Sequence, residues 1–371
     1  MNRETANQLL EEIADELNIP DGTLEKAVNS YTALGEYINN NSNYSVDIYP
    51  QGSIRLGTAI KPINEDDDYD IDLVALVRHQ FRDAKNLKFE IGNVLKNSDR
   101  YSKMLEDEGR RCWTIKYAED AHFHMDVLPS QDDIAKDDDT IMITDKIGVL
   151  YSFRSSNPKG YAKWFYEKAK FSSEHFYNSI EPIKTNSKRS TLQKTVQLLK
   201  RHRDIAYSNK SEEESENKPI SIIITTVATR LYSGKENVLE LMEKFATSWK
   251  TCFEEDYSGN LILRNPVDNN ENFADKWIEK PSKKLAFVEW ANSLKTDLSE
   301  TIFPVYTDRV KEASHLKTIF GTKVVESVYS RNAEKIVDPY ISKSQDSIGI
   351  TKEKTDTPVK KHTFYGNDKN S

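Results

Sequence analysis

A chain of 371 residues is long enough for roughly two domains of about 150 residues each. Hydrophobic residues make up 37% and charged residues 30%, which is typical of a soluble globular protein. We expect a cytoplasmic protein with no membrane partner, because no apolar run approaches the roughly 20 residues of a membrane span and the polar N-terminus has no signal-peptide pattern. The formal net charge of −8 argues against constitutive DNA binding. Cys112 and Cys252 form no metal or disulfide framework and are expected to be reduced.

The first part of the chain mixes helical periodicity with short apolar strands. The predicted elements are two helices or one sharply broken helix over residues 5–38, a strand over 46–50, a short helix or turn over 54–60, a loop over 65–68, a strand over 69–77, a helix over 83–97, and a strand pair over 112–117 and 121–128. This order predicts a mixed sheet flanked by helices, and with the helical second part it places the chain in the α+β class.

From about residue 161 the patterns are helical. Leu192, Val196 and Leu199 predict one face of a long helix, and residues 208–218 predict a charged, Ser-rich loop. Residues 221–232 are ambiguous, because their β-branched content favours a strand whereas the preceding proline and Ser221 favour a capped helix start. The predicted division is a core with its N-terminal helices over residues 1–160, a helical domain over 161–336 and a mostly disordered tail over 337–371.

Three aspartates carry the chemistry. Asp70 and Asp72 are two residues apart in a predicted strand, so their side chains point to one face. Clustered carboxylates are costly unless cations compensate them, and Mg²⁺ favours a few carboxylates combined with substrate phosphates. Asp126, in a later strand, would complete a site for two Mg²⁺ ions about 3.5–4 Å apart, with Mn²⁺ as a possible substitute.

Gln51, Gly52 and Ser53 precede these aspartates. Glycine lets the backbone approach a phosphate closely, and the serine offers a hydroxyl and an N–H group. A Gly-Ser pair alone is typical of a turn, and Asp-x-Asp in an acidic run is typical of a solvated loop. Their occurrence together, in this order, favours in-line phosphoryl transfer. His122 and His124 share strand parity with Asp126, but a fourth ligand with zinc-site spacing is missing.

These residues resemble the polymerase-β-like nucleotidyltransferases and, within them, the bacterial CD-NTases of anti-phage (CBASS) operons, which are related to cyclic GMP–AMP synthase and oligoadenylate synthase. The stretches that carry the resemblance are QGSIRLGTAIKP (51–62) with YDIDLV (69–74), FHMDVLP (123–129), TLQKTVQLLKRHRD (191–204) with PISIIITT (219–226), and NPVDNNENFADKW (265–277). The resemblance implies that Asp70, Asp72 and Asp126 bind metal and that Lys200 and Ser221 contact the donor triphosphate. It also favours a helix over residues 221–232.

The basic cluster of Lys194, Lys200 and Arg201 then has two interpretations, a triphosphate clamp or an ordinary solvated helix face. The resemblance also implies a cyclic oligonucleotide synthase that uses ATP, GTP or other nucleoside triphosphates, releases pyrophosphate and makes a second messenger for a separate effector. A nucleotidyltransferase that modifies RNA, a protein or a small molecule, and a non-catalytic scaffold, are the alternatives. Activation by duplex DNA is not expected, because the chain has neither a Cys/His zinc insertion nor a strongly basic face.

The end of the chain, residues 340–371, matches no catalytic segment of that family. Phe364 and Tyr365 place two aromatic residues in a polar tail, which is either uninvolved or a short motif for an operon-encoded regulatory partner. The sequence leaves open the choice of bases, the linkage (3′–5′ or 2′–5′) and whether two or three nucleotides are joined.

Overall fold

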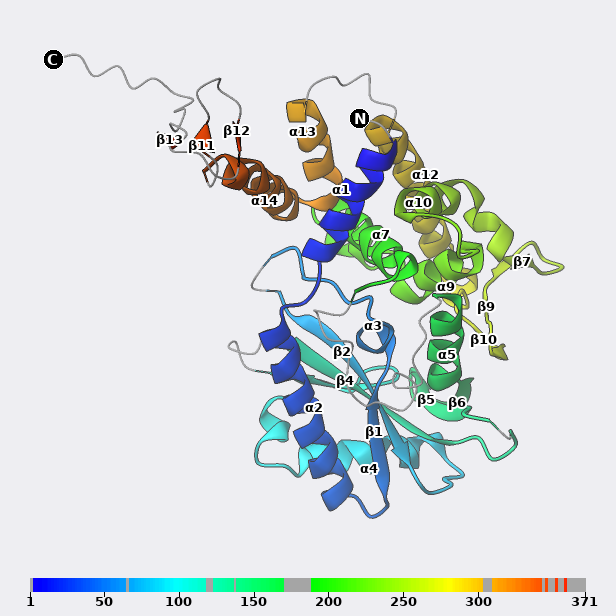
Figure 1. Ribbon diagram of the computed structural model, residues 1–371. Coiled ribbons are helices and arrows are strands. Elements are labelled where there is room, and N and C mark those ends of the chain that lie inside the picture. Colours follow the sequence, from blue (N-terminus) through cyan, green and yellow to red (C-terminus); the bar gives the residue numbers. More distant parts are fainter. Residues whose placement is uncertain are drawn as a thin grey trace.

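The computed structural model describes residues 3–64, 67–117, 123–136, 138–169, 188–302 and 309–341, and three two-residue strands beyond them. Within these ranges the chain forms a half built on a mixed sheet and a half built of helices, one above the other in Figure 1. None of the described helices combines the length and the apolar character required to span a membrane.

The sheet has the order β1-β2-β4-β5-β6, and β3 pairs with β4 beside this path. Its strands are β1 (Val46–Pro50), β2 (Tyr69–Val77), β3 (Trp113–Lys116), β4 (Phe123–Asp132), β5 (Ile141–Ile147) and β6 (Leu150–Ser156). β2 and β4 are parallel, whereas the other pairs are antiparallel. The first four strands lie where they were predicted. The β5–β6 hairpin was not predicted, since β6 is largely exposed and β5 buries the charged Asp145.

The two faces of β2 have different neighbours because successive side chains point to opposite sides of a strand. Ile71, Leu73, Ala75 and Val77 pack in one core with α2 (Asp21–Asn41) and α4 (Ala84–Lys96). Val74 and Leu76 lie in a separate cluster on the other face. Asp70 and Asp72 share the parity of this second face, which is turned away from α2 and α4.

The second half is a helical body around one large core. Its longer helices are α1 (Arg3–Glu16), α5 (Pro158–Lys168), α7 (Thr191–Tyr207), α9 (Ser221–Leu231), α10 (Val238–Ser248), α12 (Pro281–Ile302), α13 (Arg309–Phe320) and α14 (Thr322–Ile341). The shorter elements are α3 (Gly52–Leu56), α8 (Glu212–Ser215), α11 (Lys276–Glu279), β7 (Glu254–Glu255), β8 (Leu261–Ile262), β9 (Arg264–Asn265), β10 (Asp268–Asn272), β11 (Ser344–Gln345), β12 (Thr351–Lys352) and β13 (Thr357–Pro358).

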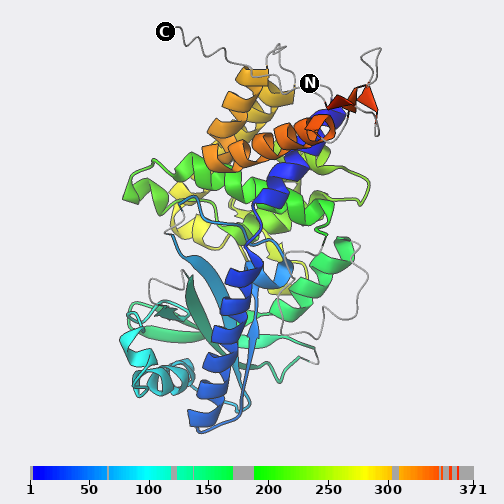
Figure 2. The same cartoon turned by 60° about the vertical axis from the view of Figure 1, so that its left-hand side comes forward.

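The two N-terminal helices belong to different halves. α2 lies along the sheet, whereas α1 packs against α7, α10 and α14, and both views show it among the helices (Figures 1 and 2). The packing thus differs from the predicted division, which placed both helices in the core over residues 1–160. Both helices are amphipathic, and their sequences do not show which core each apolar face packs against. Only the folded chain decides this. α14 also continues to Ile341, past residue 337, where the predicted tail begins.

α7 is buried on every side between Leu192 and Arg203, because it lies at the centre of the helical half. The interpretation of its basic cluster as a solvated helix face is therefore wrong: Lys194, Lys200 and Arg201 are 7%, 6% and 2% exposed. The segment at residues 221–232 forms the helix α9, despite its β-branched content. Its middle turns are enclosed by the helical core, and such packing overrides intrinsic propensity.

Candidate active site

The parallel pairing of β2 with β4 brings the three aspartates together. In the register of this pair Asp72 lies directly opposite Asp126, and Asp70 lies opposite His124. Carboxylate oxygens of Asp70, Asp72 and Asp126 all lie within 4.8 Å of one another. Oxygen ligands at this spacing suit hard divalent cations. The geometry thus assembles the predicted metal ligands at the entrance of both strands.

Two neighbours orient this group. The Thr114 hydroxyl on β3 donates to Oδ1 of Asp126 at 2.5 Å. Nε2 of His124 lies 3.3 Å from Oδ1 of Asp70, and this contact raises the pKa of His124. His124 is therefore paired with a carboxylate, and the cluster of potential metal ligands in the described chain consists of the three aspartates. His122, the other histidine of the zinc alternative, lies outside the described residues.

The cluster carries an excess of negative charge. Burial raises the pKa of Asp72 to about 7, with further contributions from the charges of Asp70 and Asp126. Burial also raises the pKa of Asp126, although the Thr114 hydrogen bond opposes that shift. Carboxylates with raised pKa values gain most from a nearby cation, so the electrostatics fit a bound divalent metal.

The Gly-Ser segment contacts the aspartates through its backbone. The Gln51 N–H donates to the Asp72 carbonyl at 2.8 Å, where β1 passes into α3. Gly52 has φ +60°, and a Cβ atom there would collide with Oδ2 of Asp72. Glycine is required at this position for two reasons, because the left-handed backbone favours it and the carboxylate occupies the space of a side chain.

A cavity of about 370 Å³ opens beside the aspartates and collects most of the predicted nucleotide-binding residues. Ser53 from α3, Lys200 from α7 and Ser221 at the start of α9 all line it, together with Asp70 and Asp72. Burial lowers the pKa of Lys200 to about 8, and its Nζ donates to the Thr58 carbonyl at 3.0 Å. Gln51 and Asp126 do not line this cavity, although Asp126 belongs to the aspartate cluster.

Arg203 is a further cavity residue. The sequence pattern does not single it out, because helical spacing puts Arg203 on the same face of α7 as Leu192, Val196 and Leu199. In the structure Arg203 donates to the Ser221 hydroxyl and to the Pro219 carbonyl, both at 2.9 Å, and it pairs with Asp204 at 2.8 Å. Lys218 also lines the cavity and lies 3.3 Å from Asp204.

Buried polar side chains of α7 hold the loop that follows α3. The Gln193 and Gln197 amides donate to the carbonyls of Leu56 and Ala59 at 2.9 Å and 3.0 Å. Arg201 donates to the Lys61 carbonyl at 2.6 Å. Together with Lys200, these donors satisfy backbone acceptors that would otherwise be buried without partners. α7 therefore positions one wall of the cavity.

A second cavity of about 340 Å³ is also lined by Asp72. Its lining shares Gly52, Leu56, Asp72 and Ile222 with the first cavity. Gln51 lines this second cavity. Asp72 therefore lines both cavities.

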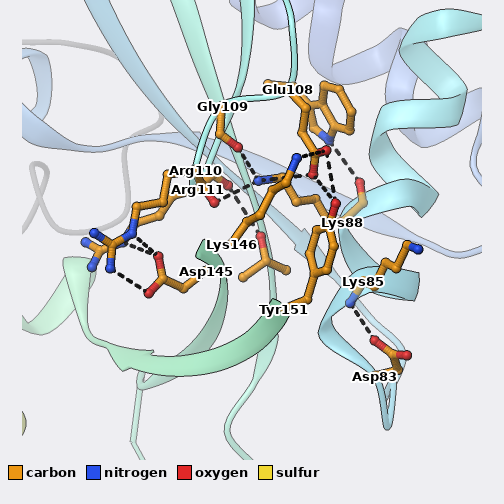
Figure 3. Close-up of polar contacts among 12 residues, drawn as sticks. Asp83, Lys85, Lys88, Glu108, Gly109, Arg110, Arg111, Asp145, Lys146 and Tyr151 are labelled. Atoms are coloured by element: carbon orange, nitrogen blue, oxygen red, sulfur yellow. Dashed lines mark hydrogen bonds and ion pairs between the residues drawn. The ribbon is translucent and has the colours of Figure 1, made fainter. Parts of the chain in front are cut away.

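A polar network that involves α4 and the β5–β6 hairpin holds residues 109–111 in place (Figure 3). The buried Lys88 amine donates to the carbonyls of Gly109 and Arg110 at 2.5 Å and 2.8 Å. Nε of Arg110 and of Arg111 lie 2.7 Å and 3.4 Å from Oδ1 of the buried Asp145. These contacts anchor the segment that carries Arg111 and Cys112 to the second cavity.

Comparisons with known proteins agree with this geometry. Residues 4–169, which include all three aspartates, match the second messenger oligonucleotide or dinucleotide synthetase domain. A c-di-GMP synthase of Roseivirga ehrenbergii is 29% identical over 91% of both chains. The domain match and the curated relatives support a bacterial CD-NTase, as predicted. The chain is a nucleotidyltransferase of the class that makes cyclic oligonucleotides, which confirms the predicted enzyme class.

Solved CD-NTase structures have a similar fold over most of the chain. The cyclic dinucleotide synthase CdnG of Bradyrhizobium diazoefficiens, solved in complex with GTP, superposes with a TM-score of 0.68 at 21% identity over 87% of this chain and 96% of its own. The GTP-bound form of Vibrio cholerae DncV gives 0.55 at 14% identity, over 86% and 89%. These matches confirm the predicted α+β class, a polymerase-β-like core with helices around it.

Proposed function

We propose that this CD-NTase holds a donor triphosphate in the first cavity and an acceptor nucleotide in the second, and joins them at Asp70, Asp72 and Asp126. The observation that carries this proposal is that Asp72 lines both cavities and lies beside the other carboxylates. Two substrates that react must present their reacting atoms to one another, and Asp72 is the predicted metal ligand that both cavities share.

The donor is held by residues of both halves of the molecule. Ser53 and Ser221 offer hydroxyls to the phosphates, and the Lys200 ammonium offers positive charge. Arg203 orients the Ser221 hydroxyl by donating to its oxygen, which leaves the serine proton to donate to a phosphate oxygen. The donor base then lies in the remainder of the cavity, whose lining includes Ile60 and Tyr69.

The proposed metal ligands are Asp72, which lines both cavities, Asp70, which lines the first, and Asp126 on the neighbouring strand. Two Mg²⁺ ions, or Mn²⁺, bound there would stabilise the developing charge on the attacking and leaving oxygens. Asp126 accepts the proton of the acceptor hydroxyl, and the Thr114 hydroxyl fixes the orientation of its carboxylate. The acceptor oxygen forms a bond to the donor α-phosphorus, the bond from that phosphorus to the bridging oxygen breaks, and pyrophosphate leaves.

The product that we infer is a cyclic dinucleotide. The relatives from Roseivirga ehrenbergii and Bradyrhizobium diazoefficiens are named as a c-di-GMP synthase and a cyclic dinucleotide synthase, and this chain covers 91% and 74% of their lengths. After the first transfer the linear intermediate rebinds with its ends exchanged, and a second transfer at the same aspartates closes the ring. Because nucleoside triphosphates are a cytoplasmic pool, we infer the same location for the enzyme, and a second messenger that acts in anti-phage defence.

Incubation with each labelled nucleoside triphosphate, alone and in pairs, with Mg²⁺ or Mn²⁺, tests the proposal. We expect a phosphatase-resistant nucleotide product that disappears on combined Asp70→Ala and Asp72→Ala substitution. The exposed Asp99→Ala substitution on the sheet half is the matched control and retains the product. Label that appears instead on added RNA, protein or drug would favour the alternative nucleotidyltransferase and contradict the cyclic product.

We also propose that the C-terminal tail binds a regulatory partner. Its aromatic residues Phe364 and Tyr365 lie outside the described residues, and an Escherichia coli relative, CdnC, is solved in complex with a HORMA protein. A chain that ends at Ile341, where α14 ends, tests the idea. We expect it to lose partner capture or regulation of turnover, and unchanged behaviour in both measurements would reject the proposal.

A further inference from the structure

The second cavity contains a carboxylate that nucleotidyl transfer does not use. Glu271 lies on β10, which belongs to the helical half of the sequence but packs against β6 of the sheet half. Its side chain is mostly buried, and it lines the cavity together with Asn265 and Phe273. The carboxylate of Glu271 is therefore available to whatever occupies the space beside Asp72.

The hydrogen bonds of Glu271 leave part of its acceptor capacity unused. Oε2 accepts from the Asn265 amide at 2.7 Å, and the Ser156 hydroxyl lies 3.1 Å and 3.3 Å from Oε1 and Oε2. Both donors are neutral, and together they supply two hydrogens. A carboxylate has about four lone-pair positions on its two oxygens. A ligand that offers two adjacent hydrogen-bond donors would complete this set.

Guanine is the base whose Watson–Crick edge offers two adjacent donors, the N1–H and the exocyclic N2–H₂ groups. Adenine and cytosine place a ring-nitrogen acceptor beside their amino group, and that acceptor would face a carboxylate lone pair. Uracil has one N–H between two carbonyls. Unpaired polar groups in a buried site are costly, so a carboxylate here discriminates strongly between the bases.

We propose that Glu271 selects guanine for the acceptor nucleotide, by accepting hydrogen bonds from N1–H and N2–H. The inference rests on the proposed two-cavity function and goes further by naming the base. Phe273 supports it, because its ring lines the same cavity and is held edge-on by Tyr161 at a centroid distance of 5.7 Å. Leu128 and Ile143 add apolar surface, which suits the faces of a purine.

If Glu271 only held β10 in place, its substitution would not change the choice of base. A second residue of β10, Asp268, provides the control for this structural role. Asp268 on β10 also fastens this strand to the sheet half, by accepting from Ser155 at 2.5 Å and from Lys136 at 2.9 Å. Asp268 does not line the second cavity. Asp268→Asn therefore weakens the attachment of β10 without changing the chemistry presented to a base, whereas Glu271→Gln changes that chemistry directly.

The test assigns the acceptor base without interference from the donor base. Each 2′,3′-dideoxynucleoside triphosphate serves as donor, because it has no hydroxyl with which to attack, and GTP or ATP is supplied as acceptor. The acceptor keeps its 5′-triphosphate, so the 5′ base of the linear product identifies it. We expect the wild type to favour GTP at this position, as measured by the ratio of kcat/KM for the two acceptors.

We expect Glu271→Gln to lower the GTP-to-ATP ratio by at least about 100-fold, because glutamine presents one donor and one acceptor and so matches adenine. Asp268→Asn should leave the ratio unchanged, even if it lowers the melting temperature. A folding defect in Glu271→Gln would reduce kcat/KM equally for both acceptors and would leave the GTP-to-ATP ratio unchanged, so this ratio still distinguishes base selection from a folding effect. A wild type without guanine preference, or a Glu271→Gln variant with the wild-type ratio, would overturn the inference. No transfer to any acceptor by the wild type would instead reject the two-cavity function itself.

Discussion

At the scale of single residues, two residues that line the first cavity have properties that follow from their surroundings. The Lys200 amine is enclosed between α7 and the loop after α3, and burial lowers its pKa to about 8. Gly52 combines a left-handed backbone with direct contact against Asp72. Because of these properties, we expect a pH dependence at Lys200 and an effect of substitution at Gly52 that an ordinary surface residue would not show.

The charge on Lys200 should make donor binding sensitive to pH. Because its folded-state pKa lies below the ordinary value of 10.5, Lys200 is charged below about pH 8 and becomes neutral above it. We expect KM for the donor to rise between pH 7.5 and about pH 9, up to roughly tenfold per unit above the pKa. Lys200→Arg should flatten this rise, since arginine stays protonated. A wild-type KM that is constant up to pH 9 would contradict a phosphate-binding role.

Gly52→Ala should abolish turnover, because the new Cβ would displace the Asp72 carboxylate and with it the metal ligands. Gly148→Ala is the matched control, since Gly148 has the same φ of 60° but no atom within 4 Å of the added Cβ. Both variants should lose about 1 kcal/mol or more of stability from the left-handed backbone. Thermal melting and product formation, measured side by side, separate the two effects. Full activity in Gly52→Ala would disprove the steric argument.

At the scale of elements, α7 connects the two halves through polar rather than apolar contacts. Gln193, Gln197, Lys200 and Arg201 recur along the side of the helix that meets residues 56–62, and each donates to a backbone carbonyl there. A helix buried on all sides normally presents apolar residues. The polar residues are present because the facing loop has no secondary structure to satisfy its own carbonyls.

Removal of one of these donors should destabilise the loop. Gln193→Leu leaves the Leu56 carbonyl without its donor and the Ser190 N–H without the Gln193 acceptor of its capping box. We expect the free energy of unfolding to fall by about 1–3 kcal/mol and KM for the donor to rise. Gln8→Leu on the exposed side of α1 is the control and should change neither quantity. Equal melting curves for the two variants would show that water replaces the lost donor.

At the scale of the whole molecule, the chain crosses between its halves more than once. It starts with α1 in the helical half, enters the sheet half with α2, and returns through α5 and α7. β10 then reaches back to the sheet half beside the second cavity. Both cavities are lined by residues of the two halves, so the relative position of the halves determines the shape of the proposed nucleotide sites.

Hydrogen exchange can assign α1 to its half. Ile13 on α1 and Leu34 on α2 are both fully buried, but in different cores. Each substitution by alanine should cost about 2–5 kcal/mol. We expect Ile13→Ala to reduce amide protection in α7 and α10, and Leu34→Ala to reduce it in β2 and α4. Loss of protection in the sheet strands after Ile13→Ala would place α1 with the sheet instead.

The sequence was sufficient for elements whose pattern is local. Strand parity placed Asp70 and Asp72 on one face, because successive side chains of a strand alternate whatever lies around them. Helical spacing identified the long helices, because the period of an α-helix is likewise a property of the local backbone. The β5–β6 hairpin escaped prediction because its burial is uneven and a buried Asp145 interrupts its apolar pattern. Asp145 is paired with Arg110 and Arg111, which belong to an earlier segment of the chain.

For the candidate site, too, some features could be predicted from the sequence and others depend on the tertiary structure. The residue types of Gly52, Asp70 and Asp72 and their order along the chain were enough to indicate phosphoryl transfer and a metal. The placement of Asp126 opposite Asp72 depends on the parallel register of two strands, and the enclosure of Lys200 and Glu271 depends on how two halves of the chain meet. Local backbone geometry determines which way a side chain points, but long-range packing decides what it faces, and only the tertiary structure contains that packing.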